Sequence, residues 1–499
     1  MVNDGVRMYK ILMNTPFGFV FELENDSCYF AGDYDITINR EFFGRQNTNV
    51  CAIFGMSADT EYSVHLAGNN WEIDFLIRTE KPRWVVDVRD YNAIGDGISD
   101  DTAAINIALY TAPTGAVVHI PPGEYLVSQI LLKSGVDIYL AKDAVIKQSI
   151  ERKNLAIIKG YQKSYDHQSA ALNASWEGHP LDCYCSLIYG GDAKDIRIYG
   201  EGILDGNGDI GGFWENAKIK NIAFRPKNLL LVNCEDITLA GITSRNSASW
   251  NIHPLYTHNF RALALKIESD ADSPNTDGLN PESCQDVEII GCKFSVGDDC
   301  IAIKAGKFYM SQAHYKPCRN ITIRNCHMER GHGAVVIGSE ISCGVQNVYV
   351  SRCIFTETDR GLRIKTRRGR GELSVVSGIV FENVIMERCV HGFVVNMFYF
   401  CDPDGKSEYV RTKDKLPVDE YTPKIGDITL RSIKATEILG TAIFVYGLPE
   451  SPVACLNVVD CKFEFAVERV LECPAMMEDF TVESPLDFYI ENVEECFGI

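Results

Sequence analysis

Three aspartates stand close together in the sequence, where two short polar segments flank one apolar strand pattern. Asp277 belongs to Asn-Thr-Asp-Gly at residues 275–278, and Asp298 and Asp299 are adjacent in Val-Gly-Asp-Asp-Cys at residues 296–300. Clustered carboxylates cannot all stay ionised comfortably, so one is pushed toward the protonated form that a general acid needs. Hydrolysis of a glycosidic bond uses both forms, because a carboxylic acid protonates the leaving oxygen while a carboxylate activates water. These three residues are therefore candidate catalytic residues.

Basic side chains follow the aspartates farther along the chain. His332 stands between two glycines, and Arg363 and Lys365 occupy alternate positions of a short strand pattern. An arginine fork pairs with a carboxylate at two points and lysine adds a point charge, so this pair predicts contact with a uronate. The formal net charge of −20 disfavours a nucleic acid partner, and a polyanionic substrate would require basic residues to gather locally. Basic residues are clustered in this way between Arg363 and Arg370. Arg368 and Arg370 are therefore further candidates for substrate binding.

A repeated strand pattern must position these residues. From about residue 185, a short apolar strand pattern recurs, and each copy is followed by another short strand and a turn. One such coil cannot bury its own apolar face, so the repeats are expected to stack into a right-handed parallel β-helix of about ten coils, an all-β fold. Equivalent positions of stacked coils lie ~4.8 Å apart, which would bring the aspartates and the basic residues together on consecutive coils. Copies of this pattern begin at Asp236, Asp286, Asn320, Asn347, Gly378 and Asp427.

A separate small β-sandwich is predicted for residues 1–82, because short strands and turns recur there about every dozen residues. The segment around Tyr62 resembles the corner of a fibronectin type III domain, in which a tyrosine hydroxyl caps the turn before a strand. The β-helix is then expected to fill residues 83–499. A helix is expected at residues 102–110, with Asp100 as its N-cap, before residues 120–125 turn the chain into the first coil.

The ordered motifs Asn-Thr-Asp, Asp-Asp, Gly-His-Gly and Arg-Ile-Lys resemble the four motifs of the polygalacturonases, glycoside hydrolase family twenty-eight. The resemblance covers about residues 85–495. It implies an inverting hydrolase of α-1,4-galacturonosidic bonds that needs no metal and no other cofactor, with polygalacturonate or oligogalacturonides as its partner. The histidine of the third motif, His332, favours homogalacturonan over rhamnogalacturonan backbones, and Asn275 of the first motif is expected to bind substrate.

The resemblance also assigns a role to each charged motif residue. Asp298 would be the general acid, and Asp277 and Asp299 would hold the attacking water. His332 would sit beside the acid and influence its protonation. Arg363 and Lys365 would grip the substrate carboxylate next to the scissile bond.

Two long insertions, at residues 150–190 and 396–421, are expected to emerge as loops around the cleft. With the N-terminal sandwich and residues 366–371, they resemble the bacterial exo-acting branch of the family, although Glu372 stands where that branch often has a second glycine. The N-terminus shows no secretory signal, and eighteen cysteines without a CxxC pair suggest reduced, buried thiols. A cytoplasmic enzyme is therefore expected, or a secreted one if a signal has been removed. No apolar run is long enough to span a membrane, and the oligomeric state stays open.

Other interpretations stay open at this point. A related hydrolase of rhamnogalacturonan or xylogalacturonan, a calcium-dependent pectate lyase, or a β-helix that binds carbohydrate without catalysis would share much of this pattern. Asp277 could be a turn residue, His332 could be a packed imidazole, and the cation pair could merely neutralise the aspartates. Trp250 and His253 are expected to pack between coils rather than to catalyse.

Overall fold

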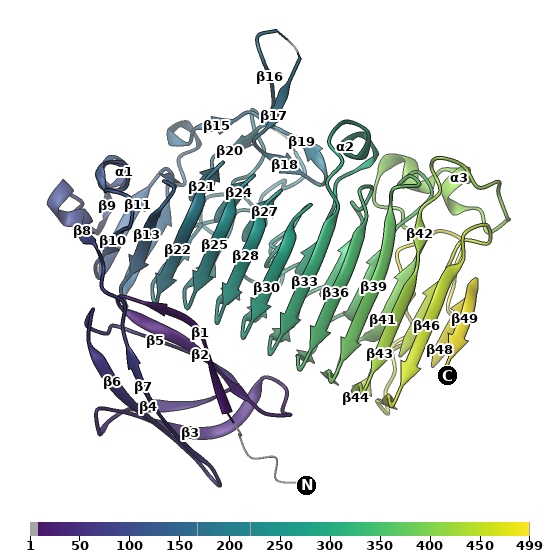
Figure 1. The fold of residues 1–499 in the computed structure, drawn as a ribbon. Helices are drawn as coiled ribbons and strands as arrows, with labels where there is room; N and C mark the ends of the chain where they lie inside the picture. Colours follow the sequence, from purple (N-terminus) through teal and green to yellow (C-terminus); the bar gives the residue numbers. More distant parts are fainter. Residues whose placement is uncertain (1–7, 167, 220, 499) are drawn as a thin grey trace.

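The computed structural model describes residues 8–166, 168–219 and 221–498. From β8 (Trp84–Asp87) onward, the chain winds through coils of short parallel strands, and the resulting sheets run the length of a right-handed β-helix (Figure 1). The predicted fold class is confirmed. Residues 1–7, in which no secretory signal is expected, lie outside the described residues.

The β-helix has three faces. One sheet of fourteen strands runs from β8 to β49 (Val493–Phe497), and a second of twelve strands runs from β9 (Asp96–Asp100) to β47 (Lys462–Phe465). The third face, which we call the site sheet, combines a four-stranded and a six-stranded sheet that are joined by isolated bridges on both sides of Leu279. Its strands are β12 (Ile130–Leu131), β21 (Ile188–Gly191), β24 (Leu229–Val232), β27 (Ile252–Leu255), β32 (Asp299–Ile303), β35 (Gly333–Gly338), β38 (Arg360–Lys365), β41 (His391–Asn396), β45 (Ile443–Tyr446) and β48 (Phe488–Glu491).

The interior is a ladder of apolar side chains that repeats from coil to coil. Ile237, Phe260 and Val287 take the same register position in three neighbouring strands, and all three are buried. Burying such a side chain stabilises the fold by roughly 1.5–3 kcal/mol. The expectation that cysteines serve as small core residues is confirmed for Cys292 and Cys326, which are buried in this ladder without a disulfide.

The first coil contains the predicted helix, but its capping residue differs from the prediction. Helix α1 spans Thr102–Thr111, and its N-cap is Asp101 rather than Asp100. The side chain of Asp101 does not cap the helix, because its two oxygens accept the backbone N–H groups of Ile94 and Gly95. Asp100 accepts the N–H of Thr102, so both carboxylates serve the local turn.

The N-terminal residues form two antiparallel sheets, as predicted for a small sandwich. The hydroxyl of Tyr62 accepts the backbone N–H of Ser57 at 2.9 Å, which ties the turn before its strand to the strand itself. The fibronectin type III resemblance stays a prediction. One sheet is β1 (Met8–Thr15), β2 (Gly18–Glu24) and β5 (Val50–Phe54), and the other is β3 (Phe30–Ile38), β4 (Glu41–Thr48), β6 (Glu61–Gly68) and β7 (Glu72–Arg78).

The sandwich packs against the side of the β-helix (Figure 1). Phe54 lies against Tyr199 with 5.7 Å between ring centroids, within an apolar cluster shared by the two parts. Beside it, the buried carboxylate of Glu22 pairs with Arg324 at 2.9 Å and with Arg352 at 3.3 Å. Burial alone would raise the pKa of Glu22, but its bonds to these arginines lower it.

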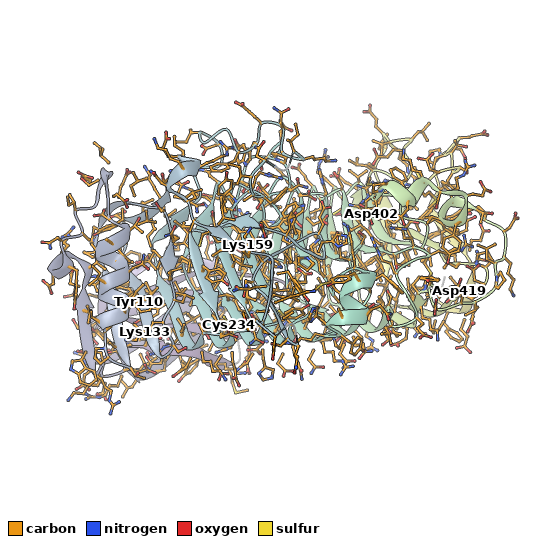
Figure 2. All side chains as sticks on the ribbon, turned by 90° about the horizontal axis from the view of Figure 1, so that it is seen from above. Tyr110, Lys133, Lys159, Cys234, Asp402 and Asp419 are labelled. Carbon is orange, nitrogen blue, oxygen red and sulfur yellow. The ribbon has the colours of Figure 1, made fainter. Side chains whose placement is uncertain are left out.

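Both predicted insertions rise on the same side of the helix. The first carries the strand pairs from β15 (Ile157–Ile158) to β20 (Cys183–Tyr184), and the second carries α3 (Glu408–Arg411). Figure 1 shows them above the site sheet, and Figure 2, which looks down on that side, places Lys159 of the first insertion and Asp402 of the second along it. The two insertions therefore flank the same stretch of the helix.

Candidate active site

A cleft of about 710 Å³ lies over the site sheet, between the two insertions. Neighbouring coils supply its residues, because Asp277 precedes the bridge at Leu279, Asp299 begins β32, and the strands β35 and β38 follow in register. Stacking of coils thus gathers side chains that are far apart in the sequence. Seven predicted site residues line this cleft: Asn275, Asp277, Asp298, Asp299, His332, Arg363 and Lys365.

Asp299 is a buried carboxylate held by two cations. Lys365 donates to its Oδ2 at 2.8 Å, and Arg363 lies 3.7 Å from its Oδ1. Burial alone would raise the pKa of Asp299, but the charges of Lys365 and Arg363 outweigh burial and lower it. Its Oδ1 has no hydrogen-bond partner among the described residues. Asp299 is therefore ionised and has one oxygen available for a water molecule.

Asp277 lies equally deep but in a different environment. Its Oδ2 accepts a hydrogen bond from Asn280 at 3.2 Å and lies 3.8 Å from the ammonium of Lys304. Burial, and next the charge of Asp298, raise the pKa of Asp277 well above its ordinary value. In the free protein, Asp277 is thus the member of the cluster that is pushed toward the protonated form.

Asp298 is the most accessible of the three aspartates. Its side chain is 22% exposed, against 4% for Asp277 and 2% for Asp299. Its Oδ1 lies 3.3 Å from Nδ1 of His332, and its Oδ2 accepts a weak hydrogen bond from Asn275 at 3.4 Å. The hydrogen bond with Asp298 raises the pKa of His332 to about 8. A sugar that enters the cleft can reach Asp298 directly.

Two cationic residues that support the site were not singled out as site residues from the sequence. Arg225 donates to the side-chain oxygen of Asn275 at 2.8 Å and so orients its amide toward Asp298. Lys304 lies between Asp277 and Glu340, and its ammonium is 4.7 Å from the ring centroid of Trp250. The sequence held one indication that Lys304 belongs to the site: it stands just past the end of the strand that begins at Asp299.

Arg368, a predicted substrate-binding residue, is not brought together with the other predicted site residues. It does not line the cleft, and its guanidinium forms a two-point pair with buried Glu450 at 2.6 and 3.0 Å. It also donates to three backbone carbonyls of the second insertion, so its hydrogen-bonding capacity is used within the fold. Arg370 is likewise buried behind the cleft, where it donates to Ser339 and Asp402. Ser339 and Asp402 both line the cleft, so Arg370 can act through these two residues.

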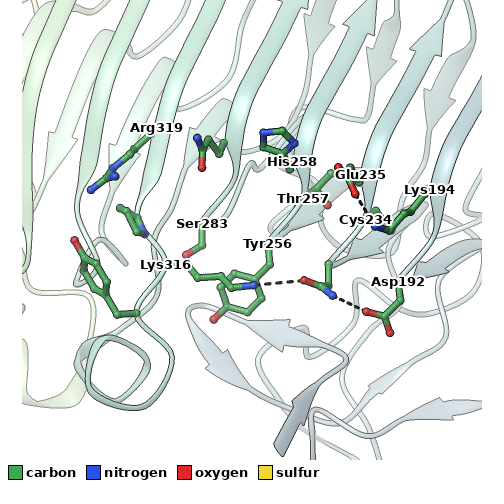
Figure 3. Close-up of a pocket in the computed structure, with 14 residues that line it drawn as sticks. Asp192, Lys194, Cys234, Glu235, Tyr256, Thr257, His258, Ser283, Lys316 and Arg319 are labelled. Atoms are coloured by element: carbon green, nitrogen blue, oxygen red, sulfur yellow. Dashed lines mark hydrogen bonds and ion pairs between the residues drawn. The ribbon is translucent and has the colours of Figure 1, made fainter.

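A second hollow, of about 570 Å³, lies at the turn between the site sheet and the fourteen-stranded sheet (Figure 3). Its charged groups bond to one another: Lys194 pairs with Glu235 at 2.7 Å, and Asn233 bridges Lys316 and Asp192. The predicted catalytic residues do not line it. The chemistry of the molecule is therefore located in the cleft with the three aspartates.

Two negative findings concern the described residues alone. No group of three or more His, Cys, Asp or Glu side chains there is arranged to hold a metal ion. Within the same residues, no helix has the length and apolar character needed to cross a membrane.

The sequence and the fold resemble those of known glycosidases. Residues 166–466 match the family described as Glycosyl hydrolases family 28, and residues 85–177 match a group described as Rhamnogalacturonase A/epimerase, pectate lyase-like. A probable polygalacturonase of Vitis vinifera is 32% identical over 371 residues, which cover 73% of this chain and 71% of that protein. An exo-poly-alpha-D-galacturonosidase of Dickeya chrysanthemi is 27% identical over 71% of this chain and 64% of its own length.

A solved structure shares the architecture from end to end. The family 28 exopolygalacturonase of Yersinia enterocolitica superposes with a TM-score of 0.65 at 18% identity, over 99% of each chain. At this identity the likeness supports the fold alone. The family match, in contrast, covers more than half of the chain and includes the three aspartates, His332, Arg363 and Lys365. This chain is a glycosidase that belongs to glycosyl hydrolases family 28.

Proposed function

We propose that this protein hydrolyses α-1,4-galacturonosidic bonds of polygalacturonate or its oligomers, with inversion, from one end of the chain. The observation that carries this proposal is the direct pairing of the cation pair with the acidic cluster: Lys365 lies 2.8 Å from Asp299 in the same cleft. An acidic cluster supplies the acid and the base for glycoside hydrolysis. A lysine and an arginine in the same cleft supply the contacts that a uronate carboxylate needs.

The geometry supports the division of roles among the aspartates. Asp298 is the accessible one, so it can reach the glycosidic oxygen and protonate it. Asp299, ionised and with one oxygen unpartnered, can take a proton from water together with Asp277. The proton that burial favours on Asp277 belongs to the whole coupled cluster.

The walls of the cleft support attack at a chain end. Glu177 of the first insertion and Tyr399, Cys401 and Asp402 of the second line the same cleft as the aspartates. Asp402 is anchored there by Lys307 at 2.9 Å and by Arg370. A polymer running through the cleft would have to pass these loops, whereas a chain end could enter between them.

Product analysis tests the proposal. Chromatography of the products from tri- and hexagalacturonate should show monogalacturonate from the first time points, with each oligomer shortened by one unit. Proton NMR during the reaction should show that the first-formed product has the β configuration. Di-, tri- or tetragalacturonate formed from hexagalacturonate at the first time points would contradict the release of single units from one end. Faster cleavage of a rhamnogalacturonan backbone would contradict the substrate.

A further inference from the structure

One hairpin of the first insertion is held beside the cleft by aromatic packing and buried hydrogen bonds. It is formed by β18 (Ser175–Trp176) and β19 (His179–Pro180), and the two residues between them, Glu177 and Gly178, make its tip. The ring of Trp176 stacks on Trp250 of the helix with 4.5 Å between centroids. The hairpin is therefore part of the wall rather than a loose loop.

Buried polar bonds hold the same hairpin from below. The hydroxyl of Ser175 donates to Glu282 at 2.8 Å, and the ammonium of Lys227 donates to the carbonyl oxygen of Ser175 at 3.1 Å. Glu282 in turn bonds to His253 at 2.9 Å, and burial lowers the pKa of that imidazole to about 4. These groups are buried, so breaking any of the bonds would leave an unsatisfied polar group. This network explains why His253 and Glu282 are buried without any contact to the aspartates.

The tip closes one side of the cleft. The backbone N–H of Lys307 donates to the carbonyl oxygen of Gly178 at 3.3 Å. A Cβ atom at Gly178 would lie 2.8 Å from the Lys307 nitrogen and 3.0 Å from Cβ of Glu340, which only a glycine avoids. Gly178 also has φ +72°, which glycine adopts without strain. The tip thus docks on the segments that follow β32 and β35.

Glu177 occupies a strained position in this tip. Its φ is 46°, in the left-handed region that a long side chain rarely adopts, and its side chain is exposed within the cleft. Among the described residues it forms neither a hydrogen bond nor an ion pair. Burial by the walls of the cleft, and next the charge of Glu340, raise its pKa. Strain of this kind persists where the surrounding structure imposes it, and it is concentrated at functional sites.

We infer that Glu177 is a specificity-determining residue that accepts a hydrogen bond from the free hydroxyl at the non-reducing end of the galacturonate chain. This inference rests on the proposed function. Glu177 and the three aspartates line the same cleft, so the sugar attacked by water is placed between the aspartates and the wall that carries Glu177. Its O4 points away from the scissile bond. Inside a chain O4 is part of the next glycosidic bond, so only a terminal sugar offers an O4 hydroxyl to a fixed acceptor.

The proposed function assigns the carboxylate of the sugar to Arg363 and Lys365, which leaves a hydroxyl as the partner of Glu177. Lys304 and Lys307 lie near the tip and act on the charge of Glu177. Their own partners are Glu340 and Asp402, at 3.4 and 2.9 Å. A carboxylate without such a partner, in a cleft built for an acidic sugar, would repel the uronate unless it met a hydrogen-bond donor. A sugar hydroxyl is that donor.

Kinetics with end-modified trimers test the inference. The measured quantity is kcat/KM for trigalacturonate divided by kcat/KM for the trimer whose non-reducing unit is 4,5-unsaturated and lacks the O4 hydroxyl. Wild-type protein should prefer the saturated trimer by about 10- to 100-fold, the range expected for a hydrogen bond to a charged group. Glu177→Ala should abolish most of this preference. Glu177→Gln, which keeps an acceptor oxygen, should retain part of it.

Three controls keep the result unambiguous. Glu151→Ala, an exposed carboxylate of the same insertion, should keep the wild-type ratio. Melting temperatures of all variants report whether the hairpin stays folded. Trigalacturonate reduced to the alditol at its other end should be treated alike by wild type and Glu177→Ala. An unchanged ratio in folded Glu177→Ala, or altered discrimination of the alditol, would overturn the inference. If the wild type cleaves no galacturonate oligomer, the proposed function itself has failed.

Discussion

Nδ1 of His332 lies 3.3 Å from Oδ1 of Asp298, the accessible carboxylate of the acidic cluster. This contact raises the pKa of His332 to about 8, and the charges of Asp299 and Asp359 act in the same direction. The imidazole therefore keeps its proton up to mildly alkaline pH, beside the carboxyl group proposed as the acid. His332 can supply this proton to the site.

The first prediction concerns the alkaline limb of the pH–rate profile. The pair keeps its proton below the raised pKa of His332 and loses it as the pH rises through about 8, so kcat/KM should fall above that pH. In His332→Gln, no imidazole is present to hold this proton, and the limb should move to lower pH. Initial rates with trigalacturonate across the pH range measure the shift. An unmoved limb in the variant would show that His332 does not take part in protonation.

Asp298→Asn should remove the proton donor while keeping the shape of the side chain. We expect kcat to fall by at least ~10²–10⁴ with little change in the dissociation constant for trigalacturonate. Asp236→Asn is the matched control, because Asp236 is exposed on the fourteen-stranded sheet in a left-handed conformation that asparagine tolerates. Activity of Asp298→Asn within tenfold of wild type would end the assignment of Asp298 as the acid.

Lys304→Met should change the acid limb of the pH–rate profile rather than the alkaline limb. The ammonium of Lys304 opposes the burial that raises the pKa of Asp277, so its removal should raise that pKa further. Because a base works only when ionised, the acid limb of kcat/KM should move to higher pH, and kcat should fall at neutral pH. Lys266→Met, which removes an exposed lysine paired with Glu268, should leave the profile unchanged. An unmoved acid limb in a folded Lys304→Met protein would contradict the role given to Lys304.

Substitutions of the cation pair should separate binding from catalysis. Arg363→Gln should chiefly raise KM for galacturonate oligomers, since Arg363 lies 3.7 Å from Asp299 and contacts it weakly. Lys365→Met should raise KM and also lower kcat, because Lys365 holds Asp299 ionised at 2.8 Å. Loss of a buried charge partner costs about 2–5 kcal/mol in binding.

Neutral substrates provide the control for the cation pair. Fully methyl-esterified chains should be poor substrates for wild type, and both variants should lose part of that discrimination. Equal cleavage of neutral and acidic chains by wild type would mean that Arg363 and Lys365 only balance the aspartates.

The stacked coils explain why much of the site could be predicted from the sequence. Strand repeats fix the register of successive coils: Asp299 pairs with Gly333, the residue after His332, and Arg363 pairs with Val336 of the same strand. Stacking therefore brings the motifs together although they are far apart in the sequence. Glu177 lacked such a signal. Its position depends on a hairpin held by Trp176 on Trp250, a contact between segments with no common repeat.

The basic residues after β38 show the opposite error, in which a residue predicted for the site lies outside it. In a strand, alternation would have indicated which side chains share a face. Arg368 lies beyond Lys365, where the strand ends, and the loop turns its guanidinium inward to Glu450. A count of positive charges could not show this, because it does not distinguish a cleft from the interior.

The last prediction follows from that buried pair. Arg368 and Glu450 are each 1% exposed, and Arg368 also holds three carbonyls of the second insertion. Arg368→Gln leaves Glu450 as an unpaired buried charge, which should cost about 3–5 kcal/mol of stability and lower the melting temperature. Arg368→Met combined with Glu450→Met should restore part of the loss, because no charge is left unpaired. At a temperature where the Arg368→Gln protein stays folded, KM for trigalacturonate should equal that of wild type, since Arg368 does not reach the cleft. A raised KM with an unchanged melting temperature would return Arg368 to the substrate-binding residues.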